Sequence, residues 1–343
     1  MAVRRAADND EKSEMGDEEM KILVYGCGVI GSYLTHALCR AGNDVTVCAR
    51  GKTKIKLEKC GLRIKHKLQK SKTVDYPKVI GKADETEHYD IVFSIMQGQQ
   101  QTALLPDLTK VNAPLFVLIG NNLCAAETER EFHRLAGDDK TLLFGFQGTG
   151  GVREKTYSVC VRFGASRLTV GGLHRFPTER QKAVLTKAFS GTKYGLVFID
   201  DMEGWLYCHA AFILPIVYIS YAYNCDLRTA PRQAIDLLLK AAEEGYALIR
   251  KSGIKIRPVG DETYFESKPK MTAMKLAMLG IAKTTIGELV ATDHCRNAVN
   301  EMEYLDCEFN KLREKSGNFP MPNWDRLRAA MPDWESVHAK YDN

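Results

Sequence analysis

The chain has 343 residues, 45% of them hydrophobic and 27% charged, which indicates an ordinary globular protein long enough for two domains. Its 48 basic and 43 acidic residues leave a formal net charge of +5, too balanced for a nucleic-acid-binding protein. Ten cysteines occur without a C-x-x-C pair or zinc-type spacing, so we expect no metal site, reduced thiols and a cytoplasmic protein.

The first segment, residues 1–19, is rich in charged side chains and lacks the apolar stretch of a signal peptide. Such a composition cannot bury enough apolar surface to order itself. We therefore expect a loose tail that is dispensable for folding.

A strand, a glycine-rich turn and a helix follow the tail. Residues 21–25 form a short hydrophobic run, and Gly26, Gly28 and Gly31 follow at G-x-G-x-x-G spacing before a helical pattern. In a dinucleotide-binding turn, these glycines let the chain turn, let the backbone approach a pyrophosphate, and let the helix pack closely on the strand. The glycine triplet alone is a weak signal, because glycines also mark ordinary turns.

The end of the next predicted strand, residues 44–49, strengthens this interpretation. A dinucleotide fold presents there the side chain that meets the adenosine ribose, and here that residue is Arg50. A carboxylate would bind the ribose hydroxyls of NAD, whereas a guanidinium pairs with a 2′-phosphate. The sequence therefore predicts NADP(H) as the cofactor. Lys52 and Lys54 add charge nearby, although a solvated basic loop is the alternative explanation for them.

Further strands are predicted up to residue 200. Residues 90–95 and 115–119 read as buried parallel strands, and residues 142–146 are a further strand candidate. The stretches 156–164 and 167–172 alternate like an antiparallel pair at the sheet edge. A helix and a last strand end near Asp200. We therefore expect residues 20–200 to form an α/β, Rossmann-type NADP-binding domain.

Residues 201–343 read as a helical domain for substrate binding and for any homodimer contact. Its helical patterns cover residues 204–223, 231–252, 270–279 and 286–315. The most apolar run, residues 210–223, is shorter than the roughly 20 residues that cross a bilayer, so we interpret it as a buried helix and expect no membrane association. Ligands of open α/β sheets bind at the carboxyl ends of the strands, which predicts an active site between the two domains.

Four segments together resemble the ketopantoate reductase (2-dehydropantoate 2-reductase) family: "KILVYGCGVIGSYLTHALCRAGNDVTVCAR", "IVFSIMQGQQ", "LIGNNLCAAE" and the helix that opens with Trp205. The resemblance implies a Rossmann domain joined to a helical domain, with NADPH reducing a 2-oxo acid between them. It also places Asn121 near the nicotinamide. The cofactor-binding residues that it implies, with those argued above, are Gly26, Gly28, Val29, Ile30, Gly31, Arg50, Lys52, Met96, Gln97 and Asn121.

At the positions of the family's catalytic residues, this chain departs from the family pattern. Family members carry Trp-x-Lys with an asparagine one turn later, whereas this chain has Trp205, Tyr207 and Ala211. A second family lysine is replaced by Met96. For the family's Thr-Glu pair, Glu288 is a weak candidate.

Another residue must then supply the proton. Tyr207 and His209 are the candidates, and Asn121 completes the predicted catalytic set. Two positions apart on a helix, Tyr207 and His209 lie about 200° apart and cannot both face one substrate. The imidazole of His209 is intrinsically the better acid at neutral pH. The alternative is that His209 is a buried structural histidine.

A third set of candidates lies on the last long predicted helix. His294, Asn297 and Glu301 share one helical face and are our candidates for substrate binding, with a solvated face as the alternative.

Two functional hypotheses follow. The first is an NADPH-dependent reductase of a 2-oxo acid or related carbonyl compound. The second is an NADP-binding protein that has lost catalysis and acts as a sensor or interaction module.

Overall fold

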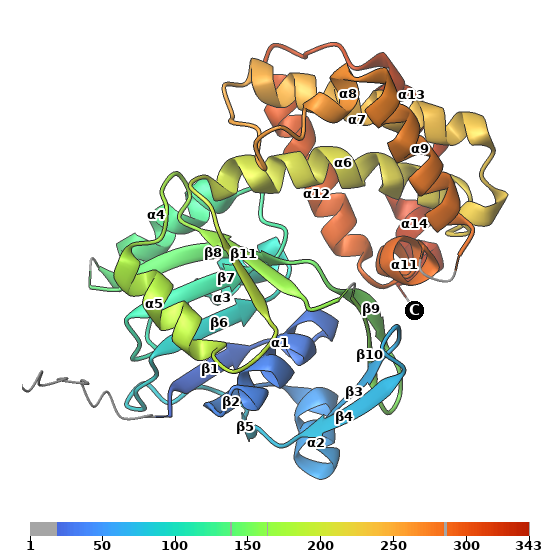
Figure 1. Cartoon of the computed structure of the whole chain (residues 1–343). Coiled ribbons are helices and arrows are strands. Elements are labelled where there is room, and N and C mark those ends of the chain that lie inside the picture. The colour runs from blue at the N-terminus through green and yellow to red at the C-terminus, as the bar shows by residue number, and fades with distance from the viewer. Residues whose placement is uncertain (1–18, 138, 163, 285–286, 343) are drawn as a thin grey trace, which may run out of the picture.

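The computed structural model describes residues 19–342 apart from 138, 163 and 285–286. An α/β domain is followed by a helical domain, and α6 (Met202–Ala222) begins where the two meet (Figure 1). The expected fold class, a Rossmann-type domain followed by an all-α domain, is confirmed. The predicted tail lies outside the described residues except for Glu19.

Eight strands form the main sheet, in the order β12-β11-β8-β7-β6-β1-β2-β5. The strands from β8 to β5 run parallel, and β6 and β7 are buried along their whole length, which explains their unbroken apolar sequences. Only β11 pairs antiparallel, with β8. The strands are β1 (Lys21–Tyr25), β2 (Asp44–Cys48), β5 (Lys78–Ile80), β6 (Ile91–Ile95), β7 (Leu115–Ile119), β8 (Thr141–Gln147), β11 (Arg167–Gly171) and β12 (Gly195–Phe198).

Helices cover both faces of this sheet. Because alternate strand residues point to opposite faces, Ile22 packs on the side of α1 and α5 while Leu23 packs on the side of α3 and α4. Leu23 belongs to a hydrophobic cluster that continues into the helical domain, so the two domains share a core. The helices of this domain are α1 (Val29–Arg40), α2 (Gly51–Cys60), α3 (Gly98–Leu108), α4 (Ala125–Ala136) and α5 (Glu179–Ala188).

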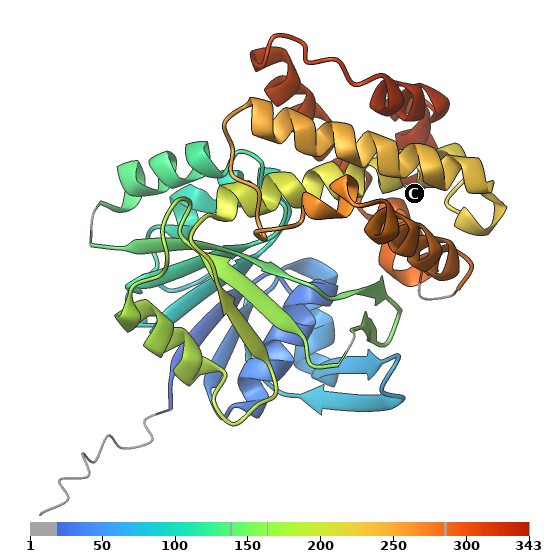
Figure 2. The ribbon, with the colours of Figure 1, turned by 45° about the horizontal axis from the view of Figure 1, so that its top comes forward.

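A second, four-stranded sheet lies against α1, in the order β4-β3-β10-β9 (Figure 2). Its strands are β3 (Leu62–His66), β4 (Ser71–Asp75), β9 (Gly150–Arg153) and β10 (Ser158–Val161). The predicted pairing of 156–164 with 167–172 is therefore wrong, because β10 pairs with β3 and β9 while β11 joins the main sheet. Alternation predicts a strand, but distant packing partners decide which strand it pairs with.

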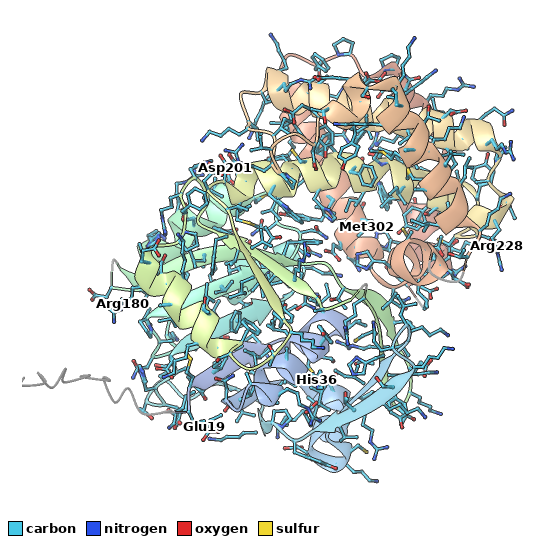
Figure 3. The ribbon with its side chains drawn as sticks, in the orientation of Figure 1. Glu19, His36, Arg180, Asp201, Arg228 and Met302 are labelled. Carbon is cyan, nitrogen blue, oxygen red and sulfur yellow. The ribbon has the colours of Figure 1, made fainter. Side chains whose placement is uncertain are left out.

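The helical domain is built around α6. By length and composition α6 could cross a membrane, but 61% of its most apolar window is buried. It packs on α7, α12 and α13, and Met302 of α12 is fully buried beside it (Figure 3). From residue 199 onward the described residues form no strand. The elements are η1 (Leu227–Thr229), α7 (Arg232–Lys251), α8 (Thr263–Glu266), α9 (Lys268–Ala282), the π-helical turn η2 (Glu288–Thr292), α11 (Asp293–Asn297), α12 (Val299–Lys315), α13 (Pro322–Ala330) and α14 (Trp334–Tyr341).

The predicted continuous helix over residues 286–315 is wrong. Ala298 leaves the helical region, with φ −141° and ψ 41°, and separates α11 from α12. The Asn297 side chain donates to the Asp293 carbonyl oxygen at 2.6 Å and so satisfies a backbone acceptor at this helix end. The break lets Cys295 and Val299, on either side of it, both be buried.

Candidate functional site

The glycine turn between β1 and α1 has the geometry of a nucleotide-binding turn. Gly26 has φ +90°, and a Cβ there would collide with the Ile95 carbonyl oxygen of the neighbouring strand β6. A Cβ at Gly31 would collide with the Gly26 carbonyl oxygen. Gly28 is the N-cap of α1 and provides no side-chain cap, so the first N–H groups of the helix are available to an anion.

A cavity of about 410 Å³ opens at the carboxyl ends of β1, β2 and β6, next to this turn. Its size falls in the range of small-molecule sites. The cavity is lined by Tyr25, Gly26, Cys27, Cys48, Ala49, Arg50, Thr53, Met96, Gln100, Ala103, Leu104, Asp107 and Arg153.

The structure brings only part of the predicted cofactor set to this cavity. Gly26, Arg50 and Met96 line it. The other predicted residues lie outside its lining: Gly28, Val29, Ile30 and Gly31 continue the turn into α1, Gln97 is the N-cap of α3, and Asn121 follows β7. Lys52 is exposed and outside the lining, and Lys54 forms an ion pair with Glu58 at 3.1 Å.

Arg50 is the N-cap of α2 and is exposed at the end of β2. The lining contains one carboxylate, Asp107, and two guanidinium groups, Arg50 and Arg153. The excess of positive charge suits a phosphate-bearing ligand. These residues therefore fit the adenosine half of a dinucleotide.

A second cluster lies where the helical domain meets the end of β7. Asn121 Nδ2 donates to Glu301 Oε1 at 2.8 Å, and both residues are buried. The other carboxylate oxygen of Glu301 lies 3.6 Å from His294 Nε2. Asn121 and two residues of the predicted helical stripe, His294 and Glu301, are thus brought together.

Tyr304, one helical turn beyond Glu301, strengthens this contact. Its hydroxyl donates to Asn122 Oδ1 at 3.1 Å and accepts from the backbone N–H of Cys124 at 3.3 Å. Gly98 also has to be small here, because a Cβ would lie 2.6 Å from the Asn121 carbonyl oxygen. The α12 helix is therefore held on the loop after β7 and on the start of α3.

His209 faces the same region from α6. Its ring stacks on Trp205 with centroids 5.1 Å apart and packs on Phe146 of β8 at 4.3 Å. The imidazole is partly exposed, and burial, followed by the nearby His294, lowers the pKa of His209 to about 4. His209 is therefore neutral at pH 7 and lies near His294.

The hydroxyl of Tyr207 is already engaged. It donates to the Leu123 carbonyl oxygen at 3.1 Å, and burial raises the pKa of Tyr207 above its ordinary value. A hydroxyl that is less acidic than usual and already donates to a backbone carbonyl is a poor proton donor to a substrate oxygen.

Two other predicted residues lie away from this cluster. Asn297 is exposed and bonds to its own helix, α11, so it takes no part in the contact between His294 and Glu301. Glu288 lies 3.8 Å from Arg296. It is Glu301, rather than Glu288, that contacts Asn121.

Sequence reasoning missed Asp107, Arg153 and Tyr304. The available signal for Arg153 was the glycine-rich stretch just before it, residues 145–151. Among the described residues, no group of three or more His, Cys, Asp or Glu side chains is arranged to hold a metal ion.

A Rossmann-type sheet with a nucleotide-type glycine turn, and a helical domain that closes on the ends of its strands, define a dinucleotide-binding oxidoreductase architecture. Residues 22–174 match the family described as Ketopantoate reductase PanE/ApbA. The expected resemblance to this family is therefore confirmed for this segment of the chain. A relative from Bacillus subtilis (strain 168), named Uncharacterized oxidoreductase YkpB, is 26% identical over 268 residues, 76% of this chain and 85% of the relative.

Solved structures share the whole two-domain fold. D-mandelate dehydrogenase, in a ternary structure with NADH and anilino(oxo)acetate, matches with a TM-score of 0.70 at 15% identity over 94% of this chain and 99% of that chain. The 2-dehydropantoate 2-reductase from Methylococcus capsulatus matches with a TM-score of 0.67 at 16% identity over 94% and 98%. At these identities the likeness shows the fold. Together with the family match, it indicates a ketopantoate reductase-like oxidoreductase acting on a small molecule.

Proposed function

We propose that this protein is an NADPH-dependent reductase of a 2-oxo acid or a related carbonyl compound. The observation that carries the proposal is the Asn121–Glu301 hydrogen bond, which joins a polar cluster of the helical domain to the carboxyl end of β7, at the strand ends of the sheet that carries the glycine turn. The oxidoreductase relative and the structural neighbours that reduce or oxidise 2-oxo or 2-hydroxy acids support it.

The preference for NADPH rests on Arg50. A guanidinium at the end of β2 pairs with a 2′-phosphate, and the lining has no carboxylate in that position. The glycine turn and the free N–H groups of α1 would hold the pyrophosphate, and Met96, which follows β6, lines the same cavity. When bound, the nicotinamide supplies the hydride for the carbonyl carbon.

Substrate binding and assistance to the forming alkoxide are assigned to the polar residues at the junction of the two domains. Glu301 fixes the Asn121 amide through a charge-assisted hydrogen bond and lies beside His294, so it acts as a positioning residue. His294, whose side chain is 42% exposed, can bind the carboxylate of a 2-oxo acid. In this proposal the ring N–H of the neutral His209 imidazole hydrogen-bonds the substrate carbonyl oxygen and stabilises the forming alkoxide, which takes its proton from water, since the Tyr207 hydroxyl is engaged by Leu123.

The packing of His209 also bears on the substrate. Aromatic rings of Trp205 and Phe146 flank the imidazole, and Tyr207 and Met96 stand where the family pattern has lysines. The resulting site is less polar than the family pattern, so it suits a bulkier or more apolar carbonyl compound than ketopantoate.

Steady-state oxidation of NADPH across a panel of 2-oxo acids, from ketopantoate to aromatic 2-oxo acids, tests this function. Turnover of at least one member, with NADPH preferred to NADH, is the expected result. NADPH binding without turnover of any member would instead support the alternative of a nucleotide-binding protein that has lost catalysis. The Tyr207–Leu123 hydrogen bond, at the position of the family lysine, favours that alternative.

A further inference from the structure

The hairpin formed by β9 and β10 covers the first turn of α1. Its turn is closed by a hydrogen bond from the Glu154 N–H to the Tyr157 carbonyl oxygen at 2.8 Å. Ser158 Oγ and Ser32 Oγ of α1 lie 3.0 Å apart. A Cβ on Gly151 would lie 3.1 Å from Val29 Cγ1, so β9 directly contacts the start of the helix.

The same hairpin is tied to the helix that follows Arg50. Lys56 Nζ of α2 donates to the Glu154 carbonyl oxygen at 3.3 Å. The hairpin is therefore held at two points, on α1 and on α2, which flank the cavity. This attachment fixes where the last residue of β9, Arg153, can reach.

Arg153 reaches from this hairpin to the glycine turn. Its Nη2 donates to the Cys27 carbonyl oxygen at 3.1 Å and lies 3.4 Å from the position of a Cβ on Gly28. A guanidinium has five N–H donors, and among the described residues only this one carbonyl accepts from Arg153. The remaining donors are available at the cavity that Arg153 lines together with Arg50.

We propose that Arg153 is a second phosphate-binding arginine of the dinucleotide site and that it contacts the pyrophosphate, while Arg50 contacts the 2′-phosphate. The assignment follows from position. In a dinucleotide fold the pyrophosphate lies at the glycine turn and helix N-terminus, which is where Arg153 is, whereas the ribose lies at the end of the second strand, where Arg50 is. A planar guanidinium binds two phosphate oxygens at once.

This inference rests on the proposed nucleotide-binding function and makes it more specific. Both NADPH and NADH contain the pyrophosphate, so Arg153 contributes equally to the affinity for either. Arg50 contributes only to the affinity for NADPH. The ratio of the two dissociation constants therefore separates the two roles.

Fluorescence titration with NADPH and with NADH tests the assignment on the parent protein and on three variants, Arg153→Ala, Arg50→Ala and Lys155→Ala. Lys155 is an exposed residue of the same hairpin turn and lies outside the cavity lining, so its variant is the matched control. Loss of one charge-assisted contact typically weakens binding roughly tenfold to a hundredfold. Arg153→Ala is expected to weaken both cofactors by the same factor, and Lys155→Ala neither.

Arg153→Lys provides the second variant, since it keeps the charge but loses the two-pronged geometry, and an intermediate loss is expected. ADP-ribose, which has the pyrophosphate but neither the nicotinamide nor the 2′-phosphate, is expected to lose affinity for Arg153→Ala and keep it for Arg50→Ala. Unchanged affinities for Arg153→Ala beside normal parental binding would overturn the assignment of Arg153 alone, as would a loss confined to NADPH. A parent protein that binds neither dinucleotide would overturn the proposed function as well.

Discussion

Asn121 and Glu301, 180 positions apart in the chain, form a buried hydrogen bond of 2.8 Å across the junction of the two domains. Asn121 follows a strand of the nucleotide-binding sheet, and Glu301 lies in the first turn of α12. The bond therefore joins the predicted nicotinamide end of the first domain to the polar cluster of the second. A change at either residue is expected to alter the geometry of the site more than its cofactor affinity.

Glu301→Ala removes the acceptor of the Asn121 amide and leaves that donor buried without a partner. We expect kcat/KM for the carbonyl substrate to fall roughly tenfold to a hundredfold, because a charge-assisted hydrogen bond of this kind contributes about 1.5 to 3 kcal/mol. Glu301→Gln keeps an acceptor oxygen and should recover much of the loss. The exposed Glu314, on the same helix, provides the control variant Glu314→Gln. Equal kinetics for Glu301→Ala and Glu314→Gln would contradict the positioning role.

His209→Ala and Tyr207→Phe distinguish the two candidate residues for assisting the forming alkoxide. Loss of one hydrogen-bond donor to an oxyanion typically lowers kcat by a factor of about 10² to 10³, and we expect that loss for His209→Ala. Tyr207→Phe removes only the hydrogen bond to Leu123, so it should lower the free energy of unfolding by about 1 kcal/mol and leave turnover within a few-fold. Turnover and urea unfolding of both variants provide the check. The opposite pattern would assign proton donation to Tyr207.

Arg50→Ala is expected to raise the dissociation constant of NADPH roughly tenfold to a hundredfold, since it removes a pairing worth about 1.5 to 3 kcal/mol. The dissociation constant of NADH should change little, because NADH has no 2′-phosphate. Lys52→Ala, two residues along and outside the cavity lining, is the control and should have a smaller effect on NADPH. Equal losses for both cofactors in Arg50→Ala would remove the basis for the NADPH preference.

The burial of His66 in the second sheet leads us to predict that the folded protein loses stability in mild acid. Burial, with smaller effects from His36 and Arg162, lowers the pKa of His66 from 6.5 to about 4. Between pH 6.5 and 4 the unfolded chain therefore binds a proton at this position that the folded protein does not. The free energy of unfolding should fall as the pH is lowered through this window, and stability from this residue is fully present only above pH 6.5.

Unfolding in urea at several pH values from 7 to 4 tests this prediction. His66→Gln can keep a hydrogen bond to Thr73, which lies 2.9 Å from His66 Nε2, and should reduce the pH slope by about one proton. His88→Gln changes an exposed histidine and is the control. A slope that is the same in both variants would show that His66 does not contribute to it.

The nucleotide-binding half could be predicted from local sequence because its determinants are local. The glycine spacing, the apolar strands and Arg50 at the end of the second strand all fall within a single strand–turn–helix–strand segment. Steric requirements at Gly26 and Gly31 act between neighbouring elements, so a short motif specifies them. Helices such as α7 were likewise predictable, because their apolar periodicity reports the face that is buried.

Only the tertiary structure decided how the distant parts of the site meet. The sequence placed His294, Asn297 and Glu301 on one continuous helical face, but the helix breaks at Ala298, and His294 lies 3.6 Å from Glu301 across the break while Asn297 is exposed. The sequence also could not show that β10 pairs with β3 and β9 in a second sheet. It therefore did not place Arg153, the last residue of β9, at the glycine turn. The physical reason is the same in each case: strand pairing and helix packing are non-local, and the buried surface that selects them comes from residues far away in the chain.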